Sequence, residues 1–288
     1  MLGGIELGGT KTVWAVGDGT EPPREHGEFA TTAPRETLER ALACIEAVGR
    51  VAAVGVGAFG PIDLASGTVL ATPKPGWGGA EVLAMVRERA RVPVMLDTDV
   101  NAAAIGEQRL GAGRGLSDFV YMTVGTGIGG GAIVAGSIVH GAGHPEMGHV
   151  HLPRHPRDVE AGFAGICRYH PRGCLEGLAS GPAIAARHGV AAEELAADHD
   201  AWEIESHYLA LAIANLIVTL RPQRVVIGGG VLEMAGLRAR IQRKLVDDVN
   251  PDYLPVGDGS EFVTEPGLGR LAGVAGAIVL AGRALGAG

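Results

Sequence analysis

The residues best suited to chemistry gather in one short stretch, residues 140–176. This stretch holds six of the ten histidines and two of the three cysteines of the 288-residue chain. Two of its glutamates, Glu146 and Glu176, lie in compact histidine-rich motifs. Imidazole and thiolate are ligands that Zn²⁺ favours. Carboxylates and imidazoles also hydrogen-bond the many hydroxyl groups of a polyol. The stretch therefore predicts a metal site and a polyol site at one place.

The spacing C-x₂-H-x₃-C over residues 167–174, with a histidine upstream, predicts a tetrahedral zinc site with two cysteine and two histidine ligands. In a reducing compartment these two cysteines are better explained as metal ligands than as a disulfide. We prefer His149 as the fourth ligand, because one ring nitrogen can bind the metal while the other meets the polyol. His151 and His155 remain alternatives.

The 47 glycines are the second unusual feature, because they fall in groups that follow or end apolar, β-type runs. Glycine after a strand lets the backbone turn sharply and lets a ligand approach the amides. Repeated strand-then-glycine units predict an α/β protein that binds phosphate or a nucleotide on its loops. The groups are Gly8-Gly9, Gly55/Gly57/Gly60, Gly125/Gly127/Gly129–Gly131 and Gly228–Gly230.

Residues 5–12 have the pattern of a strand, a glycine turn and a returning strand. The pattern is not a Walker loop, because no G-x-x-x-x-G-K-[ST] fits. The turn amides and the Thr10 hydroxyl are suited to phosphate oxygens, and Lys11 adds positive charge. Glu6 is a candidate for holding Mg²⁺ through water.

Residues 125–130 satisfy G-x-G-x-x-G, the pattern of dinucleotide-binding proteins. That reading requires a helix directly afterwards, whereas residues 131–134 have a strand pattern. We therefore reject the dinucleotide fingerprint, and with it a nicotinamide-dependent dehydrogenase, and predict a phosphate-binding turn between two strands.

Asp99 is the candidate general base. An apolar strand delivers it to the start of an alanine-rich helix, whose N-terminus favours the ionised carboxylate. The alternative is that Asp99 only caps this helix. Asp97 is expected to face the other way and to be structural.

The chain as a whole is predicted to alternate strands and helices in a series that restarts once. The seam lies near residues 111–115, so we expect a small lobe of residues 1–112, completed by a C-terminal helix at about 270–288. The large lobe would span residues 113–269. Strands are predicted over residues 3–7, 12–17, 25–30, 51–58, 93–96, 119–124, 128–134 and 137–139. Helices are predicted over residues 34–48, 80–91, 99–110, 203–220, 235–247 and 269–285.

Composition excludes several classes of protein. The apolar fraction of 47% is too high for a disordered chain. The net charge of −8 and pI of about 5.7 disfavour a nucleic-acid binder. Neither an uninterrupted membrane-spanning run nor a signal-type N-terminus is recognisable, so we expect a cytoplasmic protein without membrane contact.

Taken together and in order, the motifs resemble the ROK family of sugar kinases from Gly4 to about Gly276. They are residues 6–11, 98–101, 124–129, 146–149 and the cysteine–histidine cluster. Residues 72–77 and 174–182 resemble the fructokinase branch in particular.

The resemblance implies an α/β, actin-like fold of two ribonuclease-H-like lobes, with ATP and a sugar in the cleft. It implies that Asp99 takes the proton from the sugar hydroxyl. The sugar would be bound by Asn101, Glu146, His149 and Glu176. The nucleotide would be bound by Gly8, Gly9, Thr10, Lys11, Thr126, Gly127, Gly228, Gly229 and Gly230. A structural Zn²⁺ would be bound by His149, Cys167, His170 and Cys174.

The expected function is ATP-dependent phosphorylation of a hexose, D-fructose to fructose 6-phosphate, with Mg²⁺. Mannose and glucose remain alternative substrates. A non-catalytic, sugar-responsive ROK regulator is the other class. Such regulators carry a DNA-binding segment before the phosphate loop, whereas the first strand here is expected within a few residues of Met1. The family resemblance also implies a homodimer.

Overall fold

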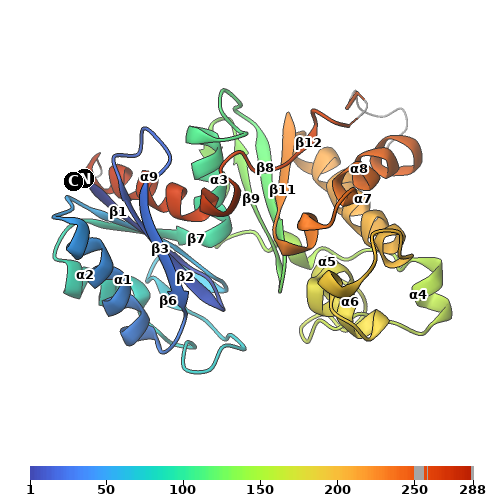
Figure 1. Ribbon diagram of the computed structural model, residues 1–288, viewed down its shortest axis with the longest axis horizontal. Helices are drawn as coiled ribbons and strands as arrows, with labels where there is room; N and C mark the ends of the chain where they lie inside the picture. The colour runs from blue at the N-terminus through green and yellow to red at the C-terminus, as the bar shows by residue number, and fades with distance from the viewer. Residues whose placement is uncertain (250–255, 258, 287–288) are drawn as a thin grey trace.

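The computed structural model describes residues 1–249, 256–257 and 259–286. It has two five-stranded sheets, each with helices on both sides (Figure 1). The first sheet has the order β3-β2-β1-β4-β7. Its strands are β1 (Leu2–Leu7), β2 (Lys11–Gly17), β3 (Glu25–Ala30), β4 (Val54–Ala58) and β7 (Val94–Thr98). In this sheet β1, β2 and β3 are antiparallel neighbours, whereas β1, β4 and β7 run parallel.

The second sheet repeats this plan with the order β10-β9-β8-β11-β12. Here too an antiparallel meander is followed by two parallel strands. Its strands are β8 (Phe119–Val124), β9 (Ile128–Val134), β10 (Ser137–Ile138), β11 (Arg224–Gly228) and β12 (Val263–Thr264). The predicted restart of the series is thus visible as two sheets of the same topology.

Helices α3 (Asp99–Leu110) and α9 (Ala272–Gly286) pack against each other near the middle of the molecule (Figure 1). Glycines make this contact possible. A Cβ on Gly276 of α9 would stand 1.6 Å from the carbonyl oxygen of Ala102 in α3. On the side of the first sheet, a Cβ on Gly55 of β4 would stand 1.8 Å from the carbonyl oxygen of Ala277 in α9. The close packing fixes the start of α3, and therefore Asp99, relative to the first sheet.

The remaining helices cover the outer sides of the two sheets. On the first sheet these are α1 (Pro34–Val48) and α2 (Val82–Ala90), beside a small hairpin of β5 (Ile62–Asp63) and β6 (Thr68–Val69). In the second lobe α7 (Ala201–Leu220) and α8 (Leu237–Lys244) cover the sheet, and α4 (Pro156–Glu160), α5 (Leu175–Ala179) and α6 (Gly181–His188) lie beside α7. Single turns occur at η1 (Met147–His149), η2 (Ala192–Glu194), η3 (Gly230–Glu233), η4 (Leu245–Val249) and η5 (Gly269–Leu271).

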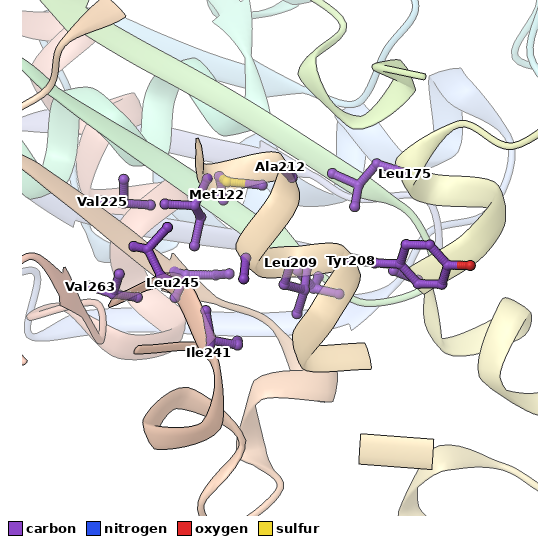
Figure 2. Packing of buried hydrophobic residues seen from close by; sticks show 14 of the residues in the cluster. Met122, Leu175, Tyr208, Leu209, Ala212, Val225, Ile241, Leu245 and Val263 are labelled. Carbon is purple, nitrogen blue, oxygen red and sulfur yellow. The ribbon is translucent and has the colours of Figure 1, made fainter. Parts of the chain in front are cut away.

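The largest apolar core lies between the second sheet and helices α7 and α8 (Figure 2). Tyr208 and Leu209 of α7, Ile241 of α8 and Val225 of β11 are all fully buried in this core. Such burial stabilises the fold by about 1.5–3 kcal/mol for each large apolar side chain.

Two helical segments are long and apolar enough to cross a membrane by length and composition alone, Ala201–Leu220 and Gly269–Gly286. Each packs inside the fold: α7 against α5 and α8, and α9 against α3, β1 and β4. Their apolar character is explained by the cores that they cover.

Most predicted elements are confirmed, including the hairpin across Ala135-Gly136, where both residues have positive φ. The predicted helix at 235–247 is instead α8 followed by the π-helical turn η4. The short elements β5, β6, β12, α4, α5 and α6 were not predicted, because they are too brief to show a period in the sequence.

Candidate active site

Asp99 is the first residue of α3, directly after β7. The cap of this helix is Thr98, whose side chain accepts a hydrogen bond from the Asn101 amide at 3.1 Å. The Asp99 carboxylate accepts one from the amide of the adjacent Val100, at 2.9 Å. Capping is therefore the task of Thr98, and the Asp99 carboxylate is left for other chemistry.

The ionisation of Asp99 differs from what its place on the helix predicts. The pKa of Asp99 is raised from 3.8 to about 7. Desolvation by the surrounding protein is the main cause, and the nearby Glu146 carboxylate adds a smaller contribution. Hydrogen bonds from the amides at the start of α3 lower the pKa, but by less than burial raises it. The helix start favours the ionised carboxylate, as predicted, but burial opposes it, so that Asp99 is only partly ionised at neutral pH. A pKa near the working pH is what an efficient general base needs.

Asp97 holds the surroundings of Asp99 in place, a task that the sequence did not reveal. One of its oxygens accepts hydrogen bonds from the Asn101 side chain at 2.7 Å and from the Thr98 amide at 2.8 Å. The other lies 2.9 Å from Nε2 of His140, in the segment after β10. Asp97 thereby joins the end of β7 in the first sheet to the second sheet.

Glycines on β9 let the start of α3 approach the second sheet. A Cβ on Gly129 would stand 2.8 Å from the Val100 side chain, and one on Gly131 would stand 2.6 Å from the Val100 carbonyl oxygen. Glu176, on α5, accepts a hydrogen bond from the Ile128 amide at 3.0 Å, at the beginning of the same strand. Asp99 and Glu176 therefore flank one end of β9.

Glu146 reaches the same region from the loop after β10. Its carboxylate is half exposed and lies 3.5 Å from Nδ1 of His144. The other nitrogen of His144 lies 3.3 Å from the Ile62 amide of the first lobe. The electrostatic effect of Glu146 on the pKa of Asp99 indicates that the two carboxylates lie near each other.

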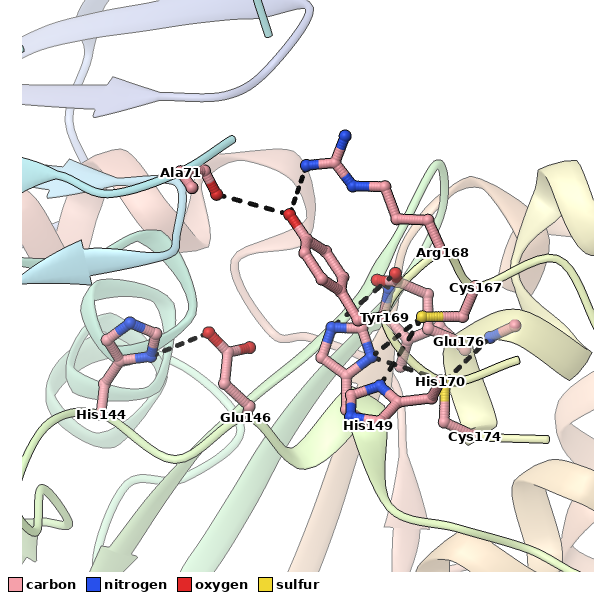
Figure 3. Close-up of polar contacts among 12 residues, drawn as sticks. Ala71, His144, Glu146, His149, Cys167, Arg168, Tyr169, His170, Cys174 and Glu176 are labelled. Atoms are coloured by element: carbon pink, nitrogen blue, oxygen red, sulfur yellow. Dashed lines mark hydrogen bonds and ion pairs between the residues drawn. The ribbon is translucent and has the colours of Figure 1, made fainter. Parts of the chain in front are cut away.

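His149 stands between the acids and the cysteines (Figure 3). Its Nδ1 lies 3.5 Å from the Cys174 sulfur and 3.8 Å from the Cys167 sulfur. Its Nε2, on the other side of the ring, lies 3.9 Å from the Glu176 carboxylate. One edge of the ring thus faces the two cysteine sulfur atoms and the other faces the Glu176 carboxylate.

The four expected zinc ligands come together. One ligand atom from each of His149, Cys167, His170 and Cys174 lies within 4.8 Å of all the others, and Cys167 Sγ is 3.7 Å from His170 Nδ1. Zinc bonds of about 2.0–2.3 Å in a tetrahedron place ligand atoms about 3.4–3.8 Å apart. The donor set and its spacing therefore fit Zn²⁺.

The two alternative histidines lie differently. His151 is exposed, and its ring packs edge-on against His170 with the centroids 5.2 Å apart. His155 caps α4, because its Nδ1 accepts from the Arg157 amide at 3.2 Å. His149 is the histidine that joins the cluster.

The predicted phosphate turn is the tight connection between β1 and β2. Its Gly9 and Thr10 are exposed, and the Gly8 amide bonds the Lys11 carbonyl at 3.0 Å. Beside the turn, burial raises the pKa of Glu6 to about 7, with a further contribution from Asp99. One Glu6 oxygen is buried without a hydrogen-bond partner. An orphaned carboxylate oxygen next to a phosphate turn suits a hydrated Mg²⁺.

A cleft of about 730 Å³ begins at Glu6 and Lys11 and continues along Gly228, Gly229 and Gly230 at the end of β11. A second cavity of about 860 Å³ adjoins it at Gly230 and is lined by Gly125 and Thr126. Of the residues predicted to bind the nucleotide, Lys11, Thr126 and Gly228–Gly230 line these two neighbouring cavities, whereas Gly8, Gly9 and Thr10 are not part of their lining. Gly127 instead faces Glu176, because a Cβ there would lie 2.8 Å from its carboxylate oxygen.

Trp77, which the sequence left open as a sugar cover or a loop anchor, is an anchor. It is fully buried, and its indole nitrogen donates to the Thr32 carbonyl at 2.8 Å.

Comparison with known proteins agrees with this arrangement. The model of the ROK family matches residues 2–284. The chain belongs to the ROK family. It is 40% identical to a fructokinase of Streptococcus mutans, over 92% of each chain. It superposes on a ROK family glucokinase of Streptomyces griseus, solved with glucose and AMPPNP, with a TM-score of 0.77 at 26% identity, covering 98% of this chain and 99% of that one.

The same fold also occurs in a ROK family transcriptional regulator, a homologue of the E. coli MLC protein. The TM-score is 0.79 at 20% identity, covering 99% of this chain and 78% of the regulator. The actin-like fold of two lobes is therefore confirmed, while the fold by itself is compatible with both kinases and regulators.

Proposed function

We propose that this chain is a hexose kinase that uses ATP to convert D-fructose to fructose 6-phosphate. The observation that carries the proposal is the place of Asp99. A carboxyl group with a pKa of about 7 stands at a helix start, and it interacts with the carboxylates of Glu146 and of Glu6, beside the turn that begins at Gly8. The S. mutans relative, a named fructokinase, supports fructose as the substrate.

The sugar would be held by Asn101, Glu146, His149 and Glu176. These groups offer hydrogen-bond acceptors and donors on rigid elements, so a ligand that lacks the matching hydroxyls leaves them unpaired in the closed site. Each unpaired buried group costs about 1–3 kcal/mol, which provides the discrimination between sugars.

In the reaction the O6 oxygen of fructose forms a bond to the γ-phosphorus of ATP. The bond from that phosphorus to the bridging oxygen breaks, and its electron pair leaves with ADP. The hydroxyl proton moves to Asp99. Because phosphoryl transfer depends mainly on positioning and on charge neutralisation, the rigid placement of Asp99 by Thr98 and α3 serves the reaction directly.

The nucleotide would bind along the two adjoining cavities. The amides of Gly8 to Lys11 and of Thr126 would hold phosphate oxygens, and Gly228 to Gly230 would lie along the adenosine. Mg²⁺ bound with ATP supplies neutralisation of the phosphate charge, and the orphaned Glu6 oxygen would hold its water shell.

The cysteine–histidine cluster would hold a structural Zn²⁺. Bound there, the metal fixes Nδ1 of His149 and leaves Nε2 free to meet the sugar beside Glu176. The metal in this cluster would thereby set the orientation of the His149 ring, and it would take no part in the phosphoryl transfer itself.

We further propose that the lobes are residues 1–112 with α9, and residues 113–269, and that they close on the sugar and exclude water. We also propose that the protein is cytoplasmic, that it forms a homodimer and that it binds no nucleic acid. Light scattering coupled to gel filtration tests the dimer directly.

The test of function is a coupled ADP-release assay with Mg²⁺ across fructose, mannose, glucose and N-acetyl sugars. We expect fructose to give the highest kcat/KM. A clear preference for glucose or mannose would retain the kinase and replace its substrate. Sugar binding without any ADP release would favour the regulator.

A further inference from the structure

Lys74 lies beside the predicted phosphate turn. The motif of residues 72–77, to which it belongs, assigned no chemical role to it. The chain has only three lysines, Lys11, Lys74 and Lys244. Two of them meet at this turn, because the Lys74 ammonium donates to the Gly9 carbonyl at 2.5 Å and to the Thr31 carbonyl at 3.2 Å. Lys74 comes from the connection between β6 and α2, far from the turn in sequence.

The two lysines differ in what balances their charge. Lys11 forms an ion pair with Glu28 at 2.6 Å. The partners of Lys74 are two uncharged carbonyl groups, and none of the ion pairs formed by the described residues includes it. Lys74 therefore brings an uncompensated positive charge to a turn suited to phosphate, where a charge-assisted hydrogen bond is about twice as strong as a neutral one.

The segment that carries Lys74 also contacts the part of the chain that holds the cysteine–histidine cluster. Ala71 accepts a hydrogen bond from the Tyr169 hydroxyl at 3.4 Å. The Tyr169 ring stands beside His149, with centroids 6.2 Å apart, above the cluster that faces the sugar (Figure 3). Three residues of extended chain span at most about 11 Å. The segment from Ala71 to Lys74 therefore links a contact with Tyr169, beside His149, to a contact with the turn at Gly9.

The connection that carries Lys74, residues 70–79, is held by backbone hydrogen bonds at both ends. The Leu70 amide donates to the Pro61 carbonyl and the Gly79 amide to the Val69 carbonyl, each at 2.8 Å. Between them, Trp77 is buried in the core of the first lobe. A lysine carried by such a segment is positioned before the ligand arrives, which is the arrangement that makes charge stabilisation effective.

We propose that Lys74 contacts the terminal phosphoryl group of ATP and neutralises the charge on it during transfer. This proposal rests on the proposed kinase function. Lys74 keeps its protons throughout: the only bonds that change are those between phosphorus and the two oxygens and the bond of the hydroxyl proton, which goes to Asp99. When ATP binds, Nζ exchanges a carbonyl oxygen for a phosphate oxygen.

The first test compares Lys74→Met and Lys74→Arg with the matched control Lys244→Met, whose lysine pairs with Glu203 in the large lobe. We expect Lys74→Met to lower kcat by about 10²–10³-fold. Lys74→Arg should restore part of the loss. The Kd for fructose without nucleotide should stay within about twofold, because Lys74 faces the phosphate and not the sugar. Lys244→Met should match the wild type.

The second test labels the lysines with an acylating reagent and locates the label by mass spectrometry. AMPPNP with fructose should protect Lys74 strongly, whereas ADP with fructose should leave it reactive, with Lys244 as the internal reference. Equal protection by both nucleotides, or none, would overturn the proposal. So would a Lys74→Met enzyme with kcat within about threefold of the wild type.

The two proposals fail in different ways. A wild-type protein that phosphorylates no sugar removes the kinase function, whatever Lys74 does. An active wild type with a fully active Lys74→Met variant removes only the role of Lys74. A Lys74→Met variant whose loss lies in a raised fructose Kd and a lowered melting temperature assigns Lys74 to bracing the loop and also overturns the proposal.

Discussion

Replacing Asp99 by asparagine should make the protein less active and more stable at once. Asparagine keeps the shape and can still accept from the Val100 amide, but it cannot take a proton. A general base contributes about 10²–10⁴-fold, so we expect kcat to fall by at least about 100-fold while fructose still binds.

The gain in stability follows from the raised pKa. A shift from 3.8 to about 7 corresponds to about 4 kcal/mol that the folded protein spends to ionise Asp99 at pH 8, at 1.36 kcal/mol for each pKa unit. Burying the asparagine amide has its own cost, so a net gain on the order of 2 kcal/mol is expected. For a chain of this size that raises the melting temperature by about 4–8 °C.

The sign of this effect is fixed by the direction of the shift. Because the folded pKa lies above the unfolded one, the folded protein binds more protons between pH 3.8 and about 7. Wild-type stability is therefore lost as the pH rises through that window. The gain of Asp99→Asn should be full above pH 7. Near pH 4, where Asp99 of the wild type is neutral, only the cost of burying the amide remains, and the variant should be no more stable than the wild type.

The assay combines ADP release with thermal melting at pH 4, 6 and 8, and Asp198→Asn, a change at an exposed aspartate, serves as the control. Asp198→Asn should leave both turnover and the pH dependence of melting unchanged. Near-normal turnover of Asp99→Asn would refute its role as the base. Equal melting of Asp99→Asn and wild type at pH 8 would refute the burial argument.

Three further predictions follow from the same site. Removing the metal with a chelator should lower the melting temperature and weaken fructose binding, and elemental analysis of the untreated protein should find about one zinc per chain; a metal-free protein of equal stability and affinity would exclude the zinc site. The kcat/KM for fructose should fall about tenfold for each pH unit below about 7, as Asp99 becomes protonated; a flat profile would contradict this. Asp97→Asn should raise the KM for fructose by about 10–100-fold, because one hydrogen bond that positions Asn101 or His140 is lost; an unchanged KM would return Asp97 to a passive role.

The repeated lobes could be predicted from the sequence because strands and glycine turns are local patterns. The strand, turn and strand around Gly8 and the hairpin at Ala135 each reveal themselves within a few residues. The spacing of Cys167, His170 and Cys174 likewise identified a ligand set without any knowledge of the fold.

Interactions between distant segments could not be predicted in this way. Asp97 lies at the end of β7 in the first sheet, and His140 follows β10 of the second sheet. The two residues meet because α3 packs against both sheets. Lys74 contacts the carbonyl of Gly9, although the two residues lie far apart in the sequence. The pKa of Asp99 depends on burial by several elements, which a helix position in the sequence does not report.

The most direct test of the account is ¹³C and ³¹P NMR of fructose incubated with Mg-ATP and either wild type or Asp99→Asn. With wild type we predict a phosphate ester at C6 that forms together with ADP, and with Asp99→Asn we predict bound but unreacted fructose over the same time. ADP and free phosphate without a sugar ester, or an ester formed equally fast by Asp99→Asn, would contradict the account.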